Sequence, residues 1–164
     1  MDLHIQEEKL TGISLLLLRL AMGWLMFYAG FTKILNPEWT AKGYLMGAKT
    51  FTGFYHWFAL PQNIGWVNFL NEWSLTLLGI SLLLGVFVRL SSVLGAVLML
   101  LYYFPVLEFP YVGQHSFLVD EHIIYALVLL IFAVVGAGRQ WSLANWLAKL
   151  PWCSKYPNFL NWLS

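Results

Sequence analysis

Four long apolar segments divide the sequence, and polar or helix-breaking residues separate them. We expect helices at about residues 12–34, 68–88, 91–107 and 118–137. The hydrocarbon core of a bilayer is about 30 Å thick, so a helix needs roughly 20 mainly apolar residues to cross it. The pattern therefore predicts an all-α fold in which four transmembrane helices form a bundle.

Prolines and glycines set the predicted ends of these helices. The first ends before Pro37, Pro105 and Pro110 close the third, and Gly136 ends the fourth. The run Arg89-Leu90-Ser91 leaves almost no loop between the second and third helices. We therefore expect these two helices to form a tight antiparallel hairpin.

Two aromatic segments are too polar and too interrupted to cross a membrane. They cover residues 38–67, between the first two predicted helices, and residues 141–164, the tail. Tryptophan and tyrosine favour the headgroup level of a membrane, so we expect both segments to lie along its surface as amphipathic helices. With the four helices they make a single integral membrane domain over residues 1–164.

The composition strengthens the membrane assignment. Of 164 residues, 60% are hydrophobic and 10% are charged, whereas a soluble domain carries about a quarter charged residues. The net charge of +1 comes without a basic run, which excludes nucleic acid as a partner. The single cysteine, Cys153, allows no internal disulfide, and the sequence holds no metal or haem motif.

The distribution of lysine and arginine predicts the orientation. Five lie on the N-terminal side of the predicted helices: Lys9, Arg89, Arg139, Lys149 and Lys155. Three lie on the opposite side: Lys33, Lys42 and Lys49. The positive-inside rule then places both termini in the cytoplasm of a multi-pass protein of the cell membrane.

Two basic residues lie on one face of the first helix, Arg19 within it and Lys33 at its far end. Steps of three and four residues connect them through Met22, Gly23, Met26 and Gly30, and small residues on such a stripe favour helix packing. Arg19 either reaches the headgroups, pairs with an acid or binds an anionic or polar ligand. Lys33 either anchors the helix at the interface or binds such a ligand.

Further ionisable residues begin the second and fourth helices. Glu72 is followed by Thr76 and Gly79 at helical spacing; it either caps its helix or faces the bundle. In the fourth helix, Asp120 is the plain helix cap. Of its neighbours, Glu121 shares a helix face with Tyr125, one turn later. His122 shares its face with small residues, which favour contact with another helix.

Together, Lys33, Glu72, Glu121 and His122 map to one end of the bundle, the predicted outer end. Such a group could bind an anion or pass protons to a quinone ring. A structural cluster of salt bridges would explain the same residues. On the first interpretation, Glu72, Glu121 and His122 are the catalytic candidates, and Arg19, Lys33 and Tyr125 bind the substrate or quinone.

Several runs of residues resemble the DoxX family in their order and spacing, over roughly residues 14–143. They are RLAMG (19–23), YAGFTK (28–33), GYL (43–45), NEW (71–73), VDEHIIY (119–125) and GAGR (136–139). The chain is most similar to the DoxD-like branch, whose type member is the membrane subunit of thiosulfate:quinone oxidoreductase. This resemblance implies a four-helix membrane protein that passes electrons from thiosulfate, or a related sulfur compound, to a membrane quinone.

Two other functions remain open at this point. The chain could be a non-catalytic accessory subunit of a larger respiratory or photosynthetic membrane complex, packed against other membrane subunits or a second copy of itself. A small transporter is the weaker alternative, because four helices are few for alternating access and no inverted repeat is present.

Overall fold

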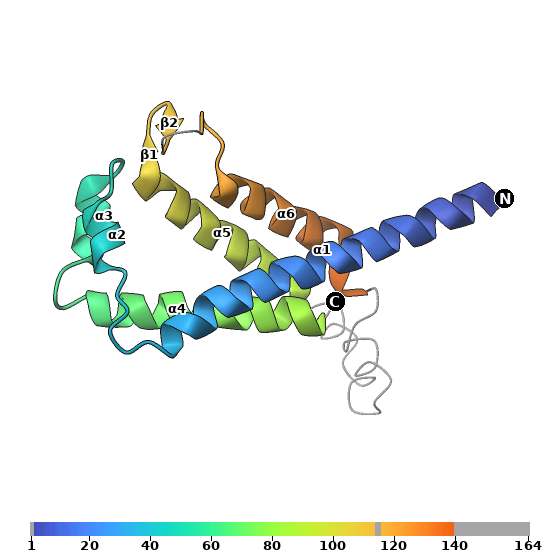
Figure 1. Ribbon diagram of the computed structural model, residues 1–164, viewed down its shortest axis with the longest axis horizontal. Coiled ribbons are helices and arrows are strands. Elements are labelled where there is room, and N and C mark those ends of the chain that lie inside the picture. The colour runs from blue at the N-terminus through green and yellow to red at the C-terminus, as the bar shows by residue number, and fades with distance from the viewer. Residues whose placement is uncertain (1, 114–115, 140–164) are drawn as a thin grey trace.

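The computed structural model describes residues 2–113 and 116–139, and helices dominate this part of the chain (Figure 1). The long helices are α1 (Asp2–Ile34), α4 (Ile64–Leu84), α5 (Val88–Val106) and α6 (Glu121–Val135). The short elements are α2 (Lys42–Met46), α3 (Thr52–Phe58), β1 (Leu107–Glu108), β2 (Tyr111–Val112) and the 3-10 helix η1 (Ala137–Arg139). The two strands form one short antiparallel pair, and the rest of the regular structure in the described residues is helical, in agreement with the predicted helical fold.

Three of the helices, α1, α4 and α5, are long and apolar enough to cross a membrane. Helix α6 is also apolar, but it has 15 residues. Large apolar side chains on these helices are exposed, for example Leu17 at 61% and Leu94 at 61%. Exposure of this kind is unfavourable in water and neutral in lipid, as expected of a membrane protein.

Several helix bounds differ from the predicted ones. Helix α1 begins at Asp2 rather than near residue 12, and its first turns extend past the bundle (Figure 1). Helix α4 ends at Leu84 and is capped by Gly85, whose φ of 70° is accessible to glycine without strain. The hairpin loop is therefore residues 85–87, and Arg89 belongs to α5.

The ends of α1 and α6 match the expectation more closely. Helix α1 stops at Ile34, shortly before Pro37. Helix α6 is shorter than predicted because the Asp120 side chain caps its first turn and Gly136 ends it in a left-handed conformation. The predicted surface segment before α4 contains two short helices, α2 and α3. The predicted tail, residues 141–164, lies outside the described residues.

The closest helix contact joins α1 to α4. A Cβ atom added to Gly79 would overlap the backbone of Phe27, and one added to Gly30 would overlap the backbone and hydroxyl of Thr76. Only glycine permits so close an approach of two backbones. The stripe of small residues predicted to be a packing face is therefore confirmed on both helices.

One apolar core joins the four long helices. Its buried members come from α1 (Met22, Met26), α4 (Leu75, Leu78, Leu82), α5 (Val88, Ala96, Met99), α6 (Ala126, Leu129, Phe132) and Ala137. A second, smaller core lies beneath α2 and α3 and contains Ala41, Leu45, Ala48, Tyr55 and Ala59. Helices α4 and α5 diverge from their hairpin toward α2 and α3, which occupy the wide end (Figure 1).

Gly79→Ala is expected to destabilise the protein by about 2 kcal/mol, because the added methyl group forces α1 and α4 apart. The measurement is the thermal unfolding midpoint of the purified protein in a mild detergent. Gly65→Ala is the matched control, since Gly65 lies in the same helix and its Cβ would meet open space. Equal midpoints for the two variants would contradict the close contact.

Candidate functional site

A cavity of about 790 Å³ lies between α4 and α5, a size within the usual range for small-molecule sites. Leucine is the commonest residue in its wall, and both helices contribute, for example Leu70, Leu77, Leu94 and Leu98. Leu77 and Leu94 are more than half exposed, so this groove is open on the side that faces lipid. Tyr44, Leu45, Tyr55 and Phe58, from α2 and α3, line it at its wide end.

The polar part of the wall includes Asn71 of α4 and Tyr102 of α5. The Lys33 ammonium group donates a hydrogen bond to Oδ1 of Asn71 at 2.9 Å. The same nitrogen lies 4.6 Å from the ring centre of Trp39 and 5.6 Å from that of Tyr102. Cation–π attraction of this kind stabilises an ammonium group where water is scarce.

The start of α6 lies behind Tyr102. The His122 ring centre is 5.8 Å from that of Tyr102, and His122 Nδ1 lies 2.6 Å from Oδ2 of Asp120. The other carboxylate oxygen of Asp120 accepts hydrogen bonds from the backbone nitrogens of His122 and Ile123. The predicted role of Asp120 as the helix cap is confirmed, and the same carboxylate also orients the histidine.

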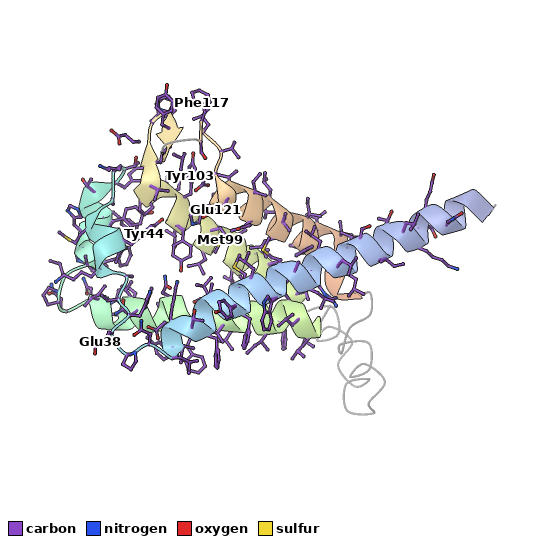
Figure 2. The ribbon with its side chains drawn as sticks, in the orientation of Figure 1. Glu38, Tyr44, Met99, Tyr103, Phe117 and Glu121 are labelled. Atoms are coloured by element: carbon purple, nitrogen blue, oxygen red, sulfur yellow. The ribbon has the colours of Figure 1, made fainter. Side chains whose placement is uncertain are left out.

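Tyrosines fasten α2 and α3 to the end of α5. Pro105 has no N–H, so the carbonyl of Leu101, one turn earlier, lacks its helical donor. The Tyr55 hydroxyl donates to this carbonyl at 3.1 Å, and the Tyr44 hydroxyl donates to the carbonyl of Tyr102. Tyr44 reaches toward α5 from α2 in Figure 2.

The Tyr44 hydroxyl is held in its neutral form. Burial is the main cause that raises the pKa of Tyr44 above its usual value, and the nearby charge of Asp120 raises it further. A neutral phenol remains a hydrogen-bond donor across the physiological pH range. The contact between α2 and α5 is therefore insensitive to pH near neutrality.

The predicted site residues lie at different distances from this cavity. Lys33 contacts Asn71 and the Tyr102 ring in its wall, and His122 contacts that ring from behind. Glu72 is half-buried, and its backbone carbonyl accepts a hydrogen bond from Thr76 at 2.8 Å. Glu121 is exposed near the start of α6 (Figure 2), and Tyr125 packs against the apolar core.

Arg19 lies near the opposite end of α6 and does not line the cavity. Its side chain is 1% exposed, and Nη1 donates to the carbonyl of Ala137 at 2.6 Å. Arg19 thus points into the protein rather than to the headgroups. It satisfies a carbonyl just beyond the C-terminal end of α6, where cations are favourable.

Asn71 and Tyr102 are not among the site residues predicted from the sequence, although Asn71 belongs to the NEW run at 71–73. Both are uncharged, whereas the predicted site residues are all ionisable groups. A polar amide within an apolar helix is a signal in its own right, because an unsatisfied amide is costly in lipid. That signal points to Asn71, whereas an interfacial tyrosine such as Tyr102 is too common to stand out.

The DoxX family profile matches residues 14–107 of the chain. No curated protein and no solved structure matches it. The matched range runs from α1 to the end of α5 and so contains every residue that lines the cavity.

Tyr55→Phe is expected to lower stability by about 1 kcal/mol, because the Leu101 carbonyl then loses its hydroxyl donor beside Pro105. Thermal unfolding in detergent measures the change. Tyr28→Phe serves as the control, since Tyr28 is 58% exposed on α1. A Tyr55→Phe midpoint no lower than that of the control would show that the hydroxyl contributes nothing there.

Proposed function

We propose that this chain, which belongs to the DoxX family of membrane proteins, is a quinone-linked redox subunit of the DoxD-like branch. On this proposal it binds a membrane quinone between α4 and α5 and serves the oxidation of thiosulfate or a related sulfur compound. The observation that carries the proposal is the cavity itself. Its walls are apolar and open to lipid, and polar and charged residues gather beside Asn71 and Tyr102.

The residues present fit such a ligand. An apolar groove open to lipid accommodates an isoprenoid chain, and the groups around Asn71 and Tyr102 are suited to a ring that carries oxygens. When bound, a quinone supplies an acceptor for two electrons and two protons. Two thiosulfate ions release two electrons as they join into tetrathionate, so the overall reaction balances.

Each charged residue near Asn71 and Tyr102 has a proposed part in this chemistry. The Lys33 ammonium group provides positive potential that stabilises negative charge on a ligand oxygen. His122, held through Nδ1 by Asp120, keeps Nε2 to exchange protons. Glu72 and Glu121 would exchange protons with the surface, and Tyr125 would support the His122 side of the site.

Electrons require a partner subunit on this proposal. The sequence has one cysteine, Cys153, and no haem or iron–sulfur motif. The sulfur compound would therefore be oxidised on a partner protein that docks at the Lys33 end of the bundle. We also propose that α6 is the fourth span and that both termini lie in the cytoplasm. At 1.5 Å per residue, α6 is about 22 Å long, so its flanking residues must complete the crossing.

Val97→Trp is expected to remove bound quinone, because Val97 lines the cavity and the larger side chain fills it. Val93→Trp is the matched control one turn earlier on α5; Val93 is similarly exposed but does not line the cavity. The measurement is the quinone extracted per protein after purification from native membranes. Wild-type protein without quinone, or equal quinone in both variants, would contradict the proposed function.

His122→Ala is expected to slow thiosulfate-dependent quinone reduction by the native complex about a hundredfold, the usual contribution of a positioned proton carrier. Bound quinone should remain, because His122 does not line the cavity. His56→Ala is the control; His56 binds the backbone of Met46 in the short-helix segment. Full activity in His122→Ala, with the chain still co-purifying with a larger complex, would instead indicate an accessory subunit.

A further inference from the structure

We infer that the Asn71 side chain is the group that recognises the ligand, and that Lys33 fixes the direction in which its amide points. This inference rests on the proposed function, because it assumes that a lipophilic carbonyl compound enters the groove between α4 and α5. Beyond the proposed function, it names Asn71 as the residue that selects the ligand and a hydrogen-bond-accepting oxygen as the feature that Asn71 selects.

The orientation of the Asn71 amide follows from its bond to Lys33. An ammonium group carries three donors and no acceptor, so it must face the carbonyl oxygen of the amide, Oδ1, at 2.9 Å. The NH₂ group then points away from Lys33. Because Asn71 lines the cavity, this NH₂ group is a polar group that α4 offers to a ligand at the Lys33 end of the helix; Ser74 and Ser81 of α4 line the cavity further along.

Tyr102 supports the same orientation from the neighbouring helix. Its hydroxyl lies next to the Asn71 side chain, and the hydroxyl oxygen is buried with no well-aligned hydrogen bond among the described residues. An amide NH₂ group has two hydrogens. One can face the Tyr102 hydroxyl while the other faces the cavity.

The chemistry of this arrangement selects an acceptor. Lys33, a cation, lies on one side of the Asn71 amide, and the phenol of Tyr102 lies beside it; neither of these two groups adds negative charge. A ligand oxygen that accepts a hydrogen bond, such as a quinone carbonyl, is therefore favoured there. A hydrocarbon of the same shape would interact with the apolar walls alone.

The test uses Asn71→Asp in the full-length protein, purified in a nonionic detergent. The substitution keeps the size of the side chain and keeps an oxygen partner for Lys33, but it replaces the NH₂ donor with an acceptor. Quenching of tryptophan fluorescence by decylubiquinone reports binding, since Trp66 lines the cavity. We expect the dissociation constant to rise about tenfold or more, as for a lost hydrogen bond combined with repulsion between oxygens.

Asn68→Asp is the matched control, one turn earlier on α4. The Asn68 amide oxygen accepts a hydrogen bond from the backbone nitrogen of Ala41 at 3.0 Å, and Asn68 does not line the cavity. Its decylubiquinone affinity should stay within about twofold of wild type. Two further measurements separate ligand recognition from folding. The thermal unfolding midpoint of Asn71→Asp should not fall below that of wild type. Its affinity for decylbenzene, a competitor that has no oxygen, should not fall either.

Each other outcome has a definite meaning. If Asn71→Asp binds decylubiquinone as tightly as wild type, the inference is wrong and the proposed function stands. If the variant loses decylubiquinone, decylbenzene and thermal stability together, Asn71 has a structural role and the inference is again wrong. If wild-type protein shows no saturable quenching, both the inference and the proposed function fail.

Discussion

The close approach of α1 to α4 is the contact on which the rest of the architecture depends. Gly30 and Gly79 let the two backbones meet with no side chain between them. In lipid the hydrophobic effect does not drive helices together, so close van der Waals contact has to supply the attraction. Helix α4 is thereby fixed against α1 near Thr76. From the hairpin at residues 85–87 it diverges from α5 (Figure 1), and the cavity lies between these two helices.

A second constraint is that backbone polar groups at membrane depth need partners. Pro105 breaks the hydrogen-bond pattern near the end of α5, and the hydroxyl of Tyr55 satisfies the carbonyl that it leaves. At the other end of the bundle, Arg19 satisfies the carbonyl of Ala137 beyond α6. Both repairs join segments that are distant in the sequence. An unpaired backbone carbonyl is thus satisfied by a tertiary contact. The contact made by Tyr55 also holds α3 across the wide end of the groove.

The sequence predicts the features that depend on local pattern. Apolar length predicts the helices, Pro37 and Gly136 predict helix ends, and the small residues of α1 and α4 predict their shared face. It does not predict features that depend on a partner remote in the chain. Arg19 binds a backbone carbonyl, that of Ala137, and such a partner leaves no trace in residue type. The hydrogen bond from Lys33 to Asn71 is missed for a similar reason. Glu72, the residue after Asn71, carries the charge that a lysine is expected to pair with, but the neutral amide accepts the hydrogen bond.

The membrane also explains how an apolar groove of this size can persist. In water, leucines such as Leu77 and Leu94 would be driven to close over it, whereas acyl chains can fill it in lipid at little cost. Any ligand must then displace acyl chains that pack against the walls about as well as it does. The walls can admit a lipophilic molecule, but they cannot select one, because the ligand and the acyl chains attract the leucines about equally. Selection must come from the polar groups of Asn71 and Tyr102. An acyl chain leaves their hydrogen-bond donors without a partner, whereas a ligand oxygen accepts a hydrogen bond from them.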